Sequence, residues 1–112
     1  ALQLASVSST YAFALVHLGT TEQAVNAMKA IVEANAEDAG EYYNLACLYS
    51  LANMKSEAIA ALQRAVELGY KSYHHIQLDR DLDNIRTETD FQQVLNLLTK
   101  SKVSKLFEAL TK

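Results

Sequence analysis

The feature that most constrains this chain is a change of phase in its apolar residues near Asn53. Residues 45–52 carry apolar side chains at helical spacing before it, and residues 58–68 carry a second set after it. Spacings of three and four place each set on one face of an α-helix. Asn53 can adopt the left-handed conformation that ends a helix, and Lys55 or Ser56 can begin the next one. So short a connection predicts two antiparallel helices, an αα-hairpin.

The chain also matches itself when it is shifted by 34 residues, so that residues 5–38 lie over residues 39–72. Gly19 then falls on Asn53, which aligns the two expected turns. Alanines coincide as well, and small side chains let paired helices approach to about 8–10 Å. We therefore expect two equivalent hairpins. The aligned alanines are Ala12 with Ala46, Ala24 with Ala58 and Ala27 with Ala61.

Composition favours an all-α fold and limits the possible partners. The 112 residues include only 3 Gly and no Pro, while half are hydrophobic, and good helix formers such as Ala and Leu are common. The net charge of −3 without a basic cluster argues against nucleic-acid binding. Polar residues interrupt the N-terminal stretch, so neither a membrane span nor a signal peptide is expected. We expect a soluble fragment of a longer protein, with a cytoplasmic location favoured.

The second hairpin resembles the tetratricopeptide repeat family. The family signature, W-x2-L-G-x2-Y followed by A-x3-F, reads here as Tyr42-x2-Leu45-Ala46-x2-Tyr49 and then Ala58-x3-Leu62. The first copy matches less well, and both copies lack the Trp and the closing Pro. The resemblance implies a superhelix made of two hairpins, residues 1–38 and 39–72, followed by degenerate capping helices over 73–112.

The last third of the chain predicts short helices rather than a third hairpin. We expect them over residues 73–77, 81–86 and 90–98, with Asp81 and Asp90 as N-caps. They would cover the apolar end of the preceding hairpin. A second apolar stripe near the C-terminus either packs back as a further cap or docks elsewhere, including on another copy of the chain. Its residues are Val103, Leu106, Phe107 and Leu110.

One acidic segment imitates a calcium loop. Asp79, Asp81 and Asp83 have the spacing with which an EF-hand loop begins. Asn84, however, replaces the glycine that permits the sharp turn, and Asp90 replaces the bidentate glutamate. Helix-capping aspartates are therefore the preferred interpretation, and no metal is expected.

No other constellation predicts catalysis or a cofactor. Cys47 lies in the middle of an expected helix with no local histidine to activate it as a nucleophile. His74 and His75 are adjacent, so on a helix they point about 100° apart and cannot chelate one metal ion together. The sequence contains no glycine-rich phosphate loop, HExxH motif or serine-centred elbow. We expect a non-enzymatic domain without a cofactor.

We expect the chain to bind a protein or peptide partner. In the tetratricopeptide family the first helix of each hairpin lines a concave groove that holds peptides. Asn44 matches a carboxylate-binding asparagine of chaperone-binding members, but their basic clamp residues are missing, so binding of EEVD tails is not expected. The alternatives are self-association and a regulatory appendage of a larger enzyme. The resemblance implies as groove residues Ser9, Phe13, His17, Tyr43, Asn44, Cys47 and Ser50.

Overall fold

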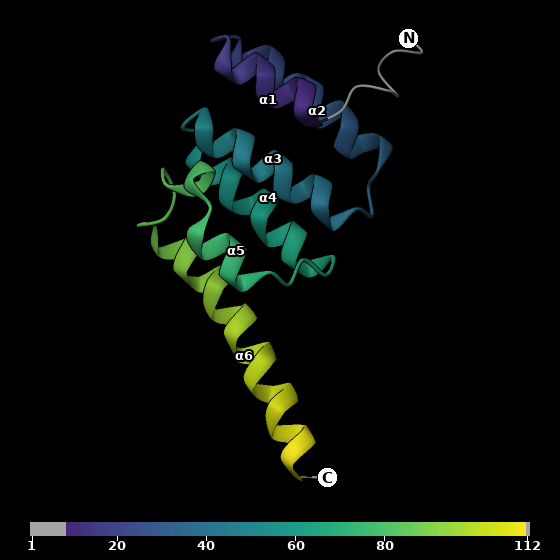
Figure 1. The fold of residues 1–112 in the computed structure, drawn as a ribbon, viewed down its shortest axis with the longest axis vertical. Coiled ribbons are helices and arrows are strands. Elements are labelled where there is room, and N and C mark those ends of the chain that lie inside the picture. The colour runs from purple at the N-terminus through teal and green to yellow at the C-terminus, as the bar shows by residue number, and fades with distance from the viewer. Residues whose placement is uncertain (1–8, 112) are drawn as a thin grey trace.

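The computed structural model describes residues 9–111, except for the side chains of residues 9–10 and 101–105. The described chain is all-helical and measures 53 × 31 × 18 Å (Figure 1). This confirms the all-α prediction. Within the described residues, no helix combines the length and the apolar character that crossing a membrane requires. The elements are α1 (Ser9–His17), α2 (Thr21–Ala34), α3 (Ala39–Leu51), α4 (Lys55–Glu67), α5 (Tyr73–Leu78), the 3-10 helix η2 (Arg80–Leu82) and α6 (Thr89–Thr111).

The same turn ends α1, α3 and α4. Gly19, Asn53 and Gly69 have φ angles of 84°, 60° and 113°. The N–H of each donates to the carbonyl three residues back at 2.9–3.0 Å, and the following N–H donates five residues back at 2.8–2.9 Å. This pair of bonds is the Schellman motif, which satisfies carbonyls that a helix end leaves unpaired. The predicted turns at residues 19 and 53 are thereby confirmed.

Helix α3 is the centre of the core. Residues 45–50 are all buried, and α3 packs against α4, α2, η2 and α1. Asp38 starts the helix, since its carboxylate accepts the N–H of Glu41 at 3.1 Å. Four of the six aligned alanines named from the sequence are fully buried. They are Ala12, Ala24, Ala46 and Ala58.

The C-terminal segment differs from the sequence prediction in how its helices divide. Helix α5 lies where it is expected. The second expected helix is only the single turn η2, and its N-cap is Asp79 instead of Asp81. The third is the first part of one long helix, α6, in which Asp90 belongs to the first turn and is not the cap. The polar residues at positions 99–102 do not end this helix, because most of them are good enough helix formers to let it continue.

Helix α6 has two different halves. Its first half packs on α4 and α5 and buries Phe91, Val94, Leu95 and Leu98. Its last turns extend beyond the other helices, so that the C-terminal end stands clear of the bundle (Figure 1). Every residue from 106 to 111 is exposed.

Candidate functional site

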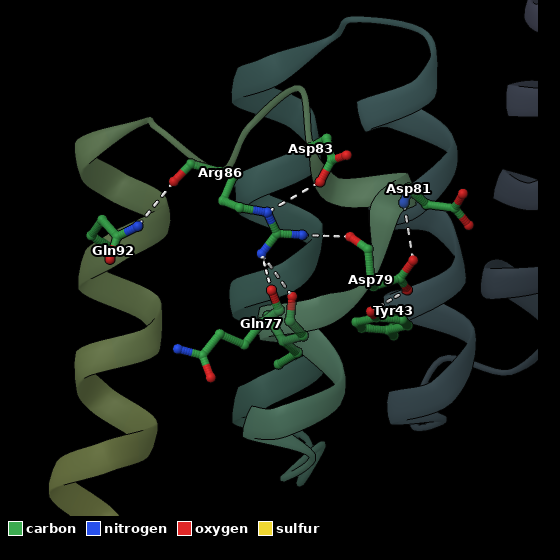
Figure 2. Close-up of polar contacts among 8 residues, drawn as sticks. Tyr43, Gln77, Asp79, Asp81, Asp83, Arg86 and Gln92 are labelled. Carbon is green, nitrogen blue, oxygen red and sulfur yellow. Dashed lines mark hydrogen bonds and ion pairs between the residues drawn. The ribbon is translucent and has the colours of Figure 1, made fainter.

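A cluster of polar contacts is centred on the carboxylate of Asp79, between α3 and the α5–η2 connection (Figure 2). The Tyr43 hydroxyl donates to Asp79 Oδ2 at 2.5 Å, and the Cys47 thiol lies 3.7 Å from the same oxygen. The backbone N–H of Asp81 donates to Oδ1 at 3.0 Å. His75 Nε2 lies 3.4 Å from Oδ2. One carboxylate therefore connects α3, α5 and η2.

Helical geometry explains why Tyr43 and Cys47 meet one acceptor. Positions i and i+4 stand one above the other on a helix face, and α3 is the helix on which η2 packs. Tyr43 is fixed further by its ring, which stacks on Tyr70 with centroids 4.3 Å apart and planes 7° apart. His75 completes the aromatic group at 5.5 Å from the Tyr43 ring.

Arg86 closes the other side of the cluster. Its guanidinium donates to the carbonyls of Ile76 and Gln77 at 3.2 and 2.6 Å, and also to the carbonyl of Asp79. These carbonyls lie at the C-terminal end of α5, where a helix has unpaired acceptors and favours a cation. Arg86 Nε also pairs with Asp83 at 3.2 Å. The Arg86 side chain thus supplies the cation that caps α5 and holds the following loop against it (Figure 2).

The electrostatics keep the two donors of α3 protonated. Burial raises the pKa of Tyr43 well above its usual range, and the hydrogen bond to Asp79 adds to the effect. Burial also raises the pKa of the Cys47 thiol, and the negative charge of Asp79 raises it further. A thiol needs a lowered pKa to act as a nucleophile. Cys47 is therefore a hydrogen-bond donor in this site and not an activated nucleophile.

Three of these groups are close enough to be considered as metal ligands. Ligand atoms of Cys47, Asp79 and Asp81 all lie within 4.8 Å of one another. Burial raises the pKa of Asp81, the charge of Asp79 raises it further, and His17 from α1 acts in the opposite direction. A metal ion would have to ionise a thiol whose pKa is raised and to compete with the Tyr43 hydroxyl for Asp79. The geometry therefore favours a structural role over a metal site: the hydrogen bonds of Asp79 hold η2 against α3.

The residues proposed for a peptide groove are distributed between buried and open positions. Tyr43, Cys47 and Ser50 are 4%, 1% and 0% exposed, and Asp79 lies directly against the first two. Their role in peptide binding stays a prediction, but a peptide would have to displace the chain's own segment to reach them. Ser50 Oγ is buried and has no hydrogen-bond partner among the residues that the structure describes.

The remaining proposed groove residues lie nearer the surface. Phe13 is half-buried against the core, and His17 at the end of α1 is exposed. Asn44 is partly exposed and donates to Glu41 Oε1 at 3.1 Å. The side chain of Ser9 lies outside the described ones. The structure brings His17 near Asp81, although no sequence pattern associates α1 with η2.

The central roles of Asp79 and Arg86 cannot be recognised in the sequence. The sequence pattern presents Asp79 only as one of several capping aspartates, and it does cap η2. Its contacts with α3 span 36 and 32 residues, and no local pattern reports such a distance. Arg86 has only a general signal, since a basic side chain near the C-terminal end of a helix can bind the carbonyls there.

Two further surfaces are open on the described molecule. A groove of about 730 Å³ lies between α4 and α6, bordered by Ile59, Val94 and Leu97 and by the Lys55–Glu88 ion pair at 3.3 Å. The second surface is the last part of α6. Three of the four residues expected there to form an apolar stripe are exposed, namely Leu106, Phe107 and Leu110, while the side chain of Val103 lies outside the described ones.

Comparison with known proteins adds a family. The family model described as "A/B hydrolase-like, N-terminal domain" matches residues 12–105 of the 112. The chain belongs to this family. A protein of Arabidopsis thaliana whose name describes it as chloroplastic is 34% identical over 62 residues, which are 55% of this chain and 18% of that protein. The chain thus matches less than a fifth of the length of that relative. No solved structure matches it significantly.

The match corrects the family assignment made from the sequence. The sequence pattern assigns the chain to the tetratricopeptide repeats, and this is wrong, because the family model places residues 12–105 in the A/B hydrolase-like N-terminal domains. The physical reason is that alanine crossings and glycine or asparagine turns are general requirements of packed helical hairpins. The residues that would have been more specific, the Trp and the closing Pro, are missing from this chain.

Proposed function

We propose that this A/B hydrolase-like N-terminal domain is a non-catalytic module that makes protein contacts beside a hydrolase-like domain in the full-length protein. The observation that carries the proposal is the family match over residues 12–105, because the family description names an N-terminal domain of hydrolase-like proteins. The proposal follows one of the alternatives drawn from the sequence, a regulatory appendage of a larger enzyme. It also keeps the expectation that the domain binds protein.

The chemistry of the polar cluster supports the non-catalytic part of the proposal. A catalytic thiol would need a base within hydrogen-bond reach and an open approach for substrate. Cys47 is 1% exposed, burial and then the charge of Asp79 raise its pKa, and Asp79 already accepts a hydrogen bond from Tyr43. These groups are suited to fastening η2 on α3, which stabilises the surfaces that the domain presents.

Activity measurements on two proteins test the non-catalytic role. The full-length protein and the segment 1–112 would be assayed with p-nitrophenyl acetate and p-nitrophenyl butyrate, each also as Cys47→Ala. We expect no turnover above buffer from the segment and no effect of Cys47→Ala on any turnover by the full-length protein. Turnover by the segment that Cys47→Ala removes would refute the proposal.

A plastid location is proposed on separate grounds. The name of the Arabidopsis relative includes the word chloroplastic, and the aligned region covers 55% of this chain. We therefore expect a fluorescent fusion of the full-length protein to colocalise with chlorophyll in leaf cells. A diffuse cytosolic signal would contradict this expectation and would favour the location inferred from the sequence.

A further inference from the structure

The end of α6 carries an apolar surface that no described part of the molecule covers. Leu106, Phe107 and Leu110 are 62%, 66% and 77% exposed. They are three large apolar side chains within one and a half turns of a helix that stands clear of the bundle (Figure 1). We call these three residues the distal face. Single exposed apolar residues need no explanation, but a cluster of this kind often marks a contact.

The distal face does not continue the row of buried residues in the first half of α6. Successive residues turn by about 100° around a helix axis, so the centre of the distal face lies about 120° from the centre of the buried set in the first half of α6. The groove beside α4, which borders Leu97, lies on yet another side. Simple lengthening of the bundle would continue the buried stripe. Because of this rotation, any body that covers the distal face would approach α6 from a different direction than α4 does.

The area of the distal face distinguishes between two possible binding partners, a second copy of the chain and a domain of the same polypeptide. Three side chains exposed to this degree present roughly 300–400 Å². Stable complexes between separate chains bury about 800 Å² on each partner, so the distal face alone is too small to hold two copies together. A partner domain that is covalently linked needs a smaller interface, because the linkage gives it an effective concentration of about millimolar.

We propose that the distal face of α6 is the docking surface for the hydrolase-like domain of the same polypeptide. The inference rests on the proposed function, which supplies that domain, and adds which surface makes the contact. The docked surface on the hydrolase-like domain must be apolar, because a polar one would leave its groups unpaired against three hydrocarbon side chains. Helix α6 would then set the distance and the direction between the two domains.

Photo-crosslinking in the full-length protein tests this assignment. p-Benzoylphenylalanine would replace Phe107, which keeps an aromatic side chain there, and cross-linked peptides would be identified by mass spectrometry. We expect a cross-link from position 107 to a peptide of the hydrolase-like domain, in a product with the mass of one chain. A product of twice that mass would overturn the proposal in favour of self-association. The lack of any cross-link would overturn it too.

Two matched charge variants show whether the distal face itself makes the contact. Leu110→Asp places a charge on the face and should lower the cross-link yield about tenfold or more. Glu108→Lys changes charge two residues away, about 150° around the helix from the face centre, and should leave the yield within about twofold. Equal effects of both variants would overturn the proposal. Since residues 106–111 are exposed, neither variant should change the melting temperature of the segment 1–112.

The outcome for the docking surface is separable from the outcome for the proposed function. If the full-length protein has no hydrolase-like domain, the proposed function fails before any cross-linking is done. If it has one, and the cross-link joins two copies of the chain, only the docking assignment fails. The non-catalytic role would then still stand on the activity measurements.

Discussion

The hydrogen bond between Tyr43 and Asp79 offers the sharpest test of how this fold is held together. Tyr43→Phe removes one hydroxyl and keeps the ring that stacks on Tyr70 at 4.3 Å. The Asp79 side chain is 14% exposed, so water replaces the lost donor only in part. A hydrogen bond to a charged group contributes about 1.5–3 kcal/mol, and we expect a loss of this size in the free energy of unfolding.

The expected change is large enough to read from a melting curve. Unfolding entropy of about 2.1 cal/mol/K per residue gives roughly 0.24 kcal/mol/K for a chain of this length, so the predicted loss corresponds to a drop of about 6–12 °C in melting temperature. Circular dichroism at 222 nm, followed during heating, measures it. Tyr42→Phe is the matched control, because its ring lies under Arg64 at 5.9 Å and its hydroxyl has no hydrogen bond within the described part of the chain.

A double-mutant cycle separates the bond from other effects of the substitution. Tyr43→Phe and Asp79→Ala should be non-additive by about 1 kcal/mol or more, because each removes the same hydrogen bond. The reasoning would be refuted if Tyr43→Phe melted within about 2 °C of Tyr42→Phe, or if the two changes were additive. Either result would mean that the carboxylate cluster does not fasten η2 to α3.

Three further predictions concern charge and backbone conformation. Folding raises the pKa values of Tyr43 and Cys47 from 10.0 and 9.0, so the unfolded chain releases these protons at lower pH than the folded protein does. The free energy of unfolding should therefore fall above pH 9, by up to about 1.4 kcal/mol per pH unit for each ionising group. Urea titrations that give the same free energy of unfolding from pH 8 to 11 would contradict this. The raised pKa of Asp81 means that the folded state disfavours its ionised form. Asp81→Asn should therefore stabilise the protein at pH 7, by less than about 1 kcal/mol because Asp81 is partly exposed. This gain in stability should vanish near pH 3, and an equal gain at both pH values would contradict the prediction. Asn53 has a φ of 60°, so Asn53→Val should cost about 1–2 kcal/mol in thermal unfolding, while Asn53→Gly should cost almost nothing; similar losses for both would show that the side chain matters more than the backbone.

The sequence is informative where structure is decided locally. Asn53 and Gly19 can be identified as helix ends because the left-handed conformation favours these residue types. The aligned alanines can be identified as crossings because only small side chains allow close helix packing. Such signals are shared by many helical folds, which is why they predict the all-α class correctly and the family wrongly.

The candidate site could be predicted only in part, because its geometry depends on long-range contacts. Tyr43 and Cys47 are recognisable as one face of a helix, but nothing near them indicates that Asp79 lies against it. Likewise, the apolar stripe at the end of α6 is expected from its spacing, whereas its separation from the core depends on α6 being one continuous helix. Local patterns specify a face, and tertiary structure specifies what lies against it.

The continuity of α6 has an implication for how the full-length protein can vary. Inserting one residue between the buried half and residue 106 would swing everything beyond it by about 100° and shift it by about 1.5 Å along the axis. An insertion of seven residues would nearly restore the direction in which the distal face points and would lengthen the helix by about 10 Å. Homologous chains should therefore tolerate length changes there in whole multiples of two turns and should reject single-residue ones.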